Sequence, residues 1–215
     1  MSCDASHLDA NTIKGIKEVT QKEEIVDNNQ EDSQRRNIET AIIGGGCFWC
    51  TEAQYLALQG VVKVISGYAG GRTENPTYQE VSTGSTGHAE VIKIEFDTSL
   101  ISYADILEAF FIAHDPTQLN RQGADVGTQY RSTIMPLDNT QKKTAERIIK
   151  DLNDQNVFSH EVVTVVEKYD QFYPAEDYHQ NYYANNKGKN PYCSRTVGPK
   201  LDKFKKVFKD KLKKN

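Results

Sequence analysis

The residue best placed to do chemistry is Cys47, which directly follows the glycines at 44–46. An apolar run at 39–43, typical of a buried strand, precedes the glycines, and a helical pattern at 47–58 follows them. The first turn of a helix carries unpaired N–H groups and the positive end of the helix dipole, which together lower the pKa of a thiol. We therefore predict that Cys47 is a nucleophile. The alternative is a buried structural cysteine, which fits a glycine-rich turn less well.

Cys50 lies three residues after Cys47, so a helix places both thiols on one face. The two can close a disulfide after Cys47 has reacted. A C-x-x-C pair is also half of a zinc site, which Cys193 with His179 or His88 could complete. However, the chain has no second C-x-x-C pair. A zinc-holding or redox-sensing thiol module without turnover, and a general dithiol oxidoreductase, therefore remain as alternative functions.

The residues around the cysteines suggest what the nucleophile meets. Phe48 and Trp49 are either core anchors or an apolar wall for a methyl or thioether group. Glu90 lies at the start of an otherwise apolar strand at 89–96, where burial would raise the pKa of its carboxyl group and make it a proton donor. The alternative for Glu90 is an exposed position on an edge strand.

Tyr68, Tyr78 and Tyr130 lie in or beside glycine-rich loops, where a phenol can donate a hydrogen bond to a developing oxyanion. With 11 tyrosines in the chain, most must serve ordinary packing. We interpret His114 and His179 as structural residues.

The elements that must position these residues alternate along the chain, which favours an α/β or α+β two-layer sandwich. Apolar spacing predicts strands at 39–43, 61–66, 89–96, 130–135 and 162–166, and helices at 47–58, 103–114, 139–152, 175–183 and 201–212.

Two parts of different composition make up the chain. Residues 1–38 form a polar leader that buries too little apolar surface to offset its ordering entropy, so we expect it to be disordered or loosely helical. Cys3 in this leader is an incidental exposed thiol. Residues 39–215 are expected to form a single catalytic domain.

Composition excludes several classes of protein. No stretch approaches the roughly 18 apolar residues of a membrane helix, and a chain with a net charge of −4 is a poor general nucleic-acid binder. Four cysteines among 215 residues are too few for a disulfide scaffold, and the N-terminus has no secretory signal pattern. We therefore expect a cytoplasmic protein, and nothing in the sequence demands more than a monomer.

Seven short motifs then follow one another in a recognisable order. They are GGCFW (45–49), GYAGG (67–71), NPTY (75–78), TGHAE (86–90), HDPT (114–117), GTQYRS (127–132) and YHQ (178–180). From about Thr40 to the C-terminus the chain thereby resembles the peptide methionine sulfoxide reductases of the A type.

This resemblance implies an α+β fold, a ferredoxin-like two-layer sandwich with extra helices and an irregular C-terminal tail. It implies reduction of methionine S-sulfoxide, free or within proteins, with thioredoxin as the reductant and no cofactor or metal. Cys47 matches the family's nucleophile and Glu90 the carboxyl group that protonates or hydrogen-bonds the sulfoxide oxygen. The remaining matches are to residues that bind the substrate. Tyr78 and Tyr130 match the phenols that share the sulfoxide oxygen, and Phe48 and Trp49 match the pocket for the S-methyl group. Asp125 matches a residue that helps to hold the substrate backbone.

The chain departs from the family pattern at the thiol that resolves the sulfenic acid, that is, the thiol that condenses with oxidised Cys47 to form a disulfide. Many members carry glycine where this chain has Cys50, and they resolve the sulfenic acid with a cysteine of the tail. Here both Cys50 and Cys193 are candidates. We expect a relay in which Cys47 and Cys50 pair first and Cys193, in a mobile tail, then exchanges into that disulfide.

Overall fold

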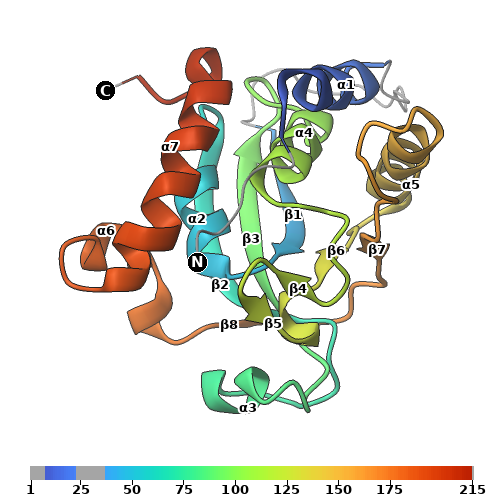
Figure 1. Ribbon diagram of the computed structural model, residues 1–215. Coiled ribbons are helices and arrows are strands. Elements are labelled where there is room, and N and C mark those ends of the chain that lie inside the picture. The colour runs from blue at the N-terminus through green and yellow to red at the C-terminus, as the bar shows by residue number, and fades with distance from the viewer. Residues whose placement is uncertain (1–7, 23–36, 215) are drawn as a thin grey trace.

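The computed structural model describes residues 8–22 and 37–214. A mixed β-sheet with the strand order β7-β6-β1-β3-β2-β8 runs through its centre (Figure 1). β6 and β7 pair in parallel, and the other neighbours pair antiparallel. The strands are β1 (Ile38–Gly45), β2 (Val61–Ala69), β3 (Ala89–Asp97), β6 (Ser132–Ile134), β7 (Val165–Val166) and β8 (Phe172–Pro174).

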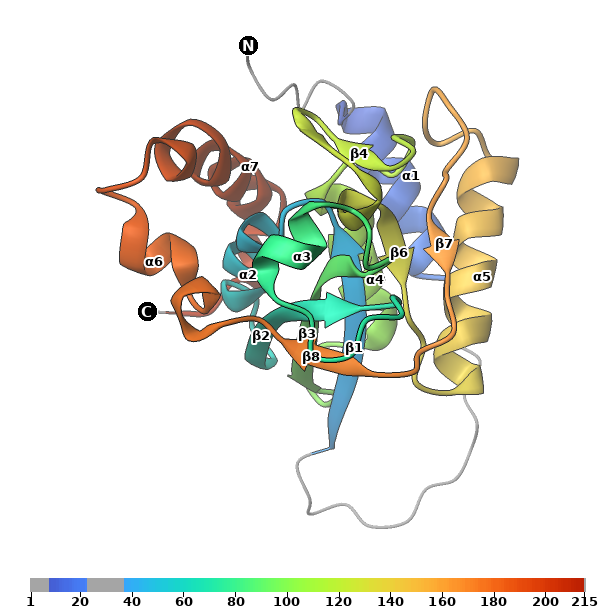
Figure 2. The same ribbon diagram turned by 90° about the horizontal axis from the view of Figure 1, so that it is seen from below.

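Helices cover this sheet, and a short hairpin of β4 (Arg121–Gln122) with β5 (Asp125–Val126) lies beside it. In Figure 2, α2 and α7 lie toward one flank of the molecule and α1 and α5 toward the other, and these helices contact α4 and share one main core with it. The fold is thus a mixed α+β architecture. The helices are α1 (Ala10–Thr20), α2 (Phe48–Leu56), α3 (Tyr78–Ser82), α4 (Tyr103–Ala113), α5 (Asn139–Asp154), α6 (Tyr182–Asn186) and α7 (Gly198–Val207).

The apolar alternation of β3 decides which of its residues face the helices. Ile92, Ile94 and Phe96 are fully buried in the main core together with Ile106 and other residues of α4. Since side chains alternate between the faces of a strand, Glu90 points to the same face as these three residues. The strand therefore delivers a carboxyl group to the end of the core.

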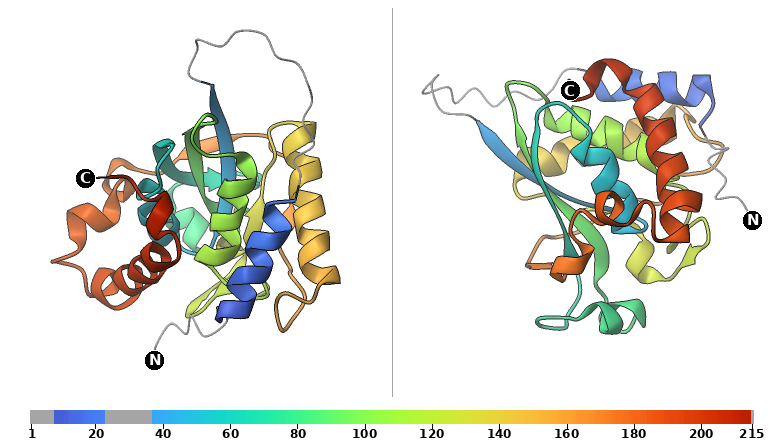
Figure 3. Two further views of the ribbon diagram at one scale, coloured as in Figure 1. Left: turned by 90° about the horizontal axis from the view of Figure 1, so that it is seen from above. Right: turned by 90° about the vertical axis from the view of Figure 1, so that its left-hand side faces the viewer.

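The prediction of an unpacked leader is wrong for α1. Its N-cap residue Asp9 accepts a hydrogen bond from the N–H of Thr12 at 2.7 Å, and Ile16 and Val19 are fully buried. α1 lies against α4 and α5 (Figure 3, left). The helix forms because apolar residues at helical spacing find a surface to cover, despite their polar neighbours. Cys3 lies outside the described residues, as do 1–7 and 23–36 of the leader.

The predicted helix at 175–183 is also wrong. The chain there makes a short turn at Asp177–His179, and α6 begins only at Tyr182. The cause is Gln180, whose side-chain amide accepts from the N–H of Ser66 and donates to its carbonyl oxygen, both at 3.0 Å. These bonds attach the segment to β2 in place of helical bonds. None of the helices in the described part of the chain is long and apolar enough to cross a membrane.

Candidate active site

Cys47 occupies the turn between β1 and α2. Gly46 has a φ of +90°, and a Cβ atom there would lie 2.6 Å from Cβ of Gln122, so only glycine fits. Cys47 is the N-cap residue of α2, and its side chain makes no capping bond to the helix. Only 7% of Cys47 is exposed.

Glu90 lies next to this turn with its carboxyl group buried. The residue is 2% exposed, and its Oε2 accepts a hydrogen bond from the N–H of Phe48 at 3.0 Å. Burial raises the pKa of the Glu90 carboxyl group from 4.5 to about 8, and the charge of Asp125 adds to this, while the bond from Phe48 opposes it. Glu90 is therefore protonated at neutral pH, and the alternative of an exposed glutamate on an edge strand is excluded.

The phenols of Tyr78 and Tyr130 lie within electrostatic range of Glu90 and Cys47. Tyr78 begins α3, and its N–H donates to Glu176 at 2.9 Å. Tyr130 ends the short helical turn at Thr128–Tyr130. Burial, followed by the Glu90 charge, raises the pKa of both phenols. Both are hydrogen-bond donors at neutral pH.

Aromatic side chains build a wall beside the thiol. The rings of Trp49 and Tyr182 stack with centroids 3.7 Å apart and planes 5° from parallel. The indole N–H of Trp49 donates to Nδ1 of His179 at 3.1 Å, so the imidazole carries its proton on Nε2. Phe48 is fully buried and its ring centroid lies 5.1 Å from that of His179. His179, interpreted as structural from the sequence, is thus part of this wall.

Tyr192 is the residue near the thiols that sequence reasoning missed. Its hydroxyl donates to Oδ2 of Asp125 at 2.9 Å and also contacts the thiols of Cys47 and Cys50. The one available signal was its position directly before Cys193. Asp125, on β5, is therefore brought to the cysteines through Tyr192.

The three described cysteines are free, buried thiols, and Cys47 and Cys50 lie in one apolar cluster. The tail around Cys193 is not irregular, contrary to expectation: Cys193 is fully buried and begins a π-helical turn, Cys193–Val197, that continues into α7. The reason is apolar spacing, because Val197 and Leu201 pack in the same cluster as Cys50. In this structure the buried Cys193 lies within electrostatic range of Cys50.

The predicted low pKa of Cys47 is also wrong for the resting protein. Burial raises the pKa of the Cys47 thiol, and a hydrogen bond with Cys50 raises it further. The same bond lowers the pKa of Cys50, helped by the charge of Lys200. Exclusion of water therefore outweighs the helix N-terminus at Cys47.

No metal-ligand set is present in the part of the chain that the structure describes. No three His, Cys, Asp or Glu side chains are grouped there so that they could hold an ion. Of the histidines proposed for zinc, His179 accepts from Trp49, and Nδ1 of His88 accepts from the N–H of Gly71 at 3.0 Å. The zinc-holding alternative has no ligand set in these residues.

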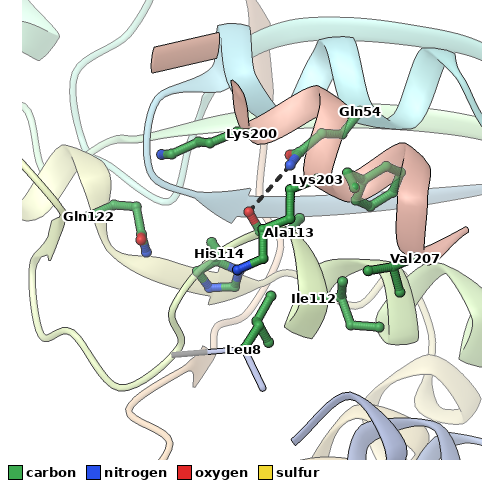
Figure 4. Close-up of a pocket in the computed structure, with 10 residues that line it drawn as sticks. Leu8, Gln54, Ile112, Ala113, His114, Gln122, Lys200, Lys203 and Val207 are labelled. Carbon is green, nitrogen blue, oxygen red and sulfur yellow. Dashed lines mark hydrogen bonds between the residues drawn. The ribbon is translucent and has the colours of Figure 1, made fainter. Parts of the chain in front are cut away.

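A separate pocket lies between α2, α4 and α7 (Figure 4). The Gln54 side chain donates to the carbonyl oxygen of Ala113 at 3.4 Å in this pocket, and Lys200 and Lys203 also line it. Its lining includes neither the thiols nor Glu90, so we assign it no part in the chemistry.

Comparison with known proteins agrees with this geometry. The family described as peptide methionine sulfoxide reductase matches residues 39–212. Peptide methionine sulfoxide reductase MsrA of Chromobacterium violaceum is 53% identical over 80% of this chain and 97% of its own length. MsrA of Saccharolobus solfataricus is 52% identical over 82% and 98%.

Solved structures of related proteins share the fold. Methionine sulfoxide reductase A of Corynebacterium diphtheriae matches with a TM-score of 0.65 and 34% identity, covering 74% of this chain and 80% of that one. Reduced Mxr1 of Saccharomyces cerevisiae matches with a TM-score of 0.64 and 30% identity, covering 78% and 95%. The chain therefore belongs to the peptide methionine sulfoxide reductase family, in its A-type (MsrA) branch.

Proposed function

We propose that Cys47 and Glu90 carry out the reduction of methionine S-sulfoxide, free or within proteins, in this enzyme. A sulfoxide sulfur becomes electrophilic when its oxygen is protonated, so an acid and a nucleophile must meet at one site. The observation that carries the proposal is the buried Glu90 carboxyl group, protonated at neutral pH and bonded to the N–H next to Cys47. A protonated carboxylic acid at neutral pH is what general acid catalysis needs.

In the proposed reaction Glu90 gives its proton to the sulfoxide oxygen while the Cys47 sulfur attacks the substrate sulfur. The oxygen passes to Cys47 as a sulfenic acid, methionine leaves, and Glu90 recovers the proton of the Cys47 thiol. Tyr78 and Tyr130 donate hydrogen bonds to the same oxygen. No other redox agent is needed for this step, because the sulfoxide is reduced as the thiol is oxidised.

The aromatic wall and Asp125 supply substrate binding in this proposal. Phe48 and Trp49 enclose the S-methyl group, and Asp125 holds the substrate backbone. In the resting protein Asp125 accepts the Tyr192 hydroxyl, so a bound substrate shares or replaces that bond.

We further propose that Cys50 resolves the sulfenic acid and that Cys193 then exchanges into the disulfide. Condensation of Cys50 with the sulfenic acid releases water and forms the Cys47–Cys50 disulfide. The position of Cys193 supports this order, because it is fully buried and lies within electrostatic range of Cys50. Thioredoxin, a dithiol, would then reduce the enzyme by thiol–disulfide exchange.

The order of the core elements along the chain and the order of the strands in the sheet support a finer description of the fold. Elements β1-α2-β2-β3-α4-β6 with sheet order β6-β1-β3-β2 are those of a ferredoxin-like sandwich.

We propose a cytoplasmic monomer that binds neither nucleic acid nor membrane. The free thiols support a reducing compartment, and light scattering of the purified protein would test the monomer.

The function is tested by thioredoxin-coupled NADPH consumption with separated S and R epimers of methionine sulfoxide. The expected result is turnover of the S epimer only, abolished in Cys47→Ser. Absence of turnover of both epimers by folded, reduced protein would instead favour a redox-sensing module. For the relay, intact thioredoxin-coupled turnover in Cys50→Ser together with its loss in Cys193→Ser would show that the order is wrong.

A further inference from the structure

Glu52 is a buried carboxylate that the reaction does not use. It lies on α2, is 1% exposed, and accepts two backbone N–H groups: Oε1 from Asn181 at 2.7 Å and Oε2 from Tyr182 at 3.0 Å. Burying a carboxylate is costly unless its oxygens are hydrogen-bonded. Each oxygen of Glu52 therefore holds the backbone of a segment that lies 129 or 130 residues away in the chain.

The backbone that Glu52 holds carries the outer ring of the aromatic wall. Tyr182 stacks on Trp49, and Trp49 lies three residues before Glu52 on the same helix. Asn181 has a φ of +51°, a left-handed conformation that a non-glycine residue adopts only when its surroundings hold it. α2 thus presents the indole and, one turn later, fixes the ring that covers it.

We propose that Glu52 is a positioning residue for the methionine-binding wall. Its carboxylate holds the Tyr182 ring on Trp49 and thereby sets the width of the slot for the thioether and S-methyl group of the substrate. This inference rests on the proposed function of the wall.

Glu52 is not needed merely to attach this segment to the sheet, because other hydrogen bonds do so. Gln180 fixes the preceding part of the segment through its bonds to Ser66 and through a bond from its side-chain amide to the Ala175 carbonyl oxygen at 2.8 Å. Loss of Glu52 therefore leaves the segment attached to β2. What the loss of Glu52 changes is the position of the Tyr182 ring on Trp49, and the experiment must therefore measure this stacking.

The test variant is Glu52→Gln, which keeps one acceptor oxygen and turns an NH₂ group toward a backbone N–H. Trp49 is the single tryptophan of the chain, so the emission spectrum of the reduced protein reports the stack directly. We expect a shifted spectrum and a KM for N-acetylmethionine S-sulfoxide raised about tenfold, as for a lost hydrogen bond to a charged group. The single-turnover rate at saturating substrate should change by less than about threefold.

Two further variants make the result decisive. Glu108→Gln is the matched control, because Glu108 is equally buried at 1% on α4 and pairs with Lys211 at 3.3 Å, away from the wall. It should lower thermal stability and leave both the emission spectrum and KM unchanged. In a Tyr182→Leu background, Glu52→Gln should add less than about twofold to KM, because the two residues act as one unit.

The proposal is overturned if Glu52→Gln keeps the wild-type spectrum and KM, or if its effect on KM multiplies fully with that of Tyr182→Leu. A wild-type protein that turns over no methionine sulfoxide would refute the proposed function instead. The emission spectra would still decide whether Glu52 holds the stack, because they need no substrate.

Discussion

Replacing Glu90 by glutamine should make the stability of the protein less sensitive to pH. The folded protein holds the Glu90 carboxyl group neutral, with a pKa raised from 4.5 to about 8 mainly by burial. An acid with a raised pKa contributes stability that is fully present below its unfolded-state pKa. That stability is lost as the pH rises through the folded-state pKa.

The size of the effect follows from those two pKa values. Their difference corresponds to about 5 kcal/mol of lost stability once Glu90 is fully ionised. Between pH 5 and pH 8, where ionisation is only partly complete at the upper end, the loss is about 3 to 4 kcal/mol. Glutamine has no charge to bury, and its amide oxygen can still accept the N–H of Phe48, so the variant should not show this loss.

The assay is urea unfolding followed by far-UV circular dichroism at pH 5 and pH 8, with a reductant present. The quantity to compare is the change in unfolding free energy between the two pH values, wild type minus Glu90→Gln. Other titrating groups are common to both proteins and cancel in this difference. A double difference below about 1 kcal/mol would refute the reasoning, since Glu90 would then not be held neutral by the fold.

Three further predictions concern the reaction and its support. Sulfenic acid formation, followed by rapid-quench single turnover, should slow by about 10²- to 10⁴-fold in Glu90→Gln; a loss below tenfold would exclude Glu90 as the acid. Ile16→Ala should cost about 2–5 kcal/mol in urea unfolding because Ile16 is fully buried under α1, and an unchanged midpoint would mean that α1 is not docked. Gly46→Ala should cost about 1–3 kcal/mol, from the positive φ and the contact with Gln122, and should slow single turnover; wild-type values would contradict the strained turn.

The elements with strong apolar periodicity could be predicted from the sequence. The predicted strand at 89–96 and helix at 103–114 correspond to β3 and α4 within a residue. The local pattern suffices for these two elements because the spacing of their apolar residues shows which side chains are buried. It failed at 175–183, where the Gln180 side chain replaces helical bonds with bonds to β2.

The site was predictable where one short motif carries both the residue and its surroundings. The turn that presents Cys47 and the burial of Glu90 at the start of a strand are of this kind. Tyr182 and Tyr192 could not be found in this way, because they come to Trp49 and to the thiols, respectively, from more than 130 positions along the chain. The low pKa predicted for Cys47 failed for a related reason: the helix N-terminus is local, while the burial that outweighs it comes from the whole fold.

The burial of Cys47 and Glu90 bears on how the proposed nucleophile is activated. With Cys47 at 7% exposure and Glu90 at 2%, both groups are held neutral, and without a substrate Cys47 carries little thiolate to react with stray oxidants. In the proposed reaction a sulfoxide changes this balance, because its oxygen accepts the Glu90 proton as its sulfur is attacked by Cys47. The carboxylate left on Glu90 would then be the base that takes the thiol proton. Burial thus couples activation of the nucleophile to the presence of a substrate that can be protonated, which a permanently ionised cysteine could not do.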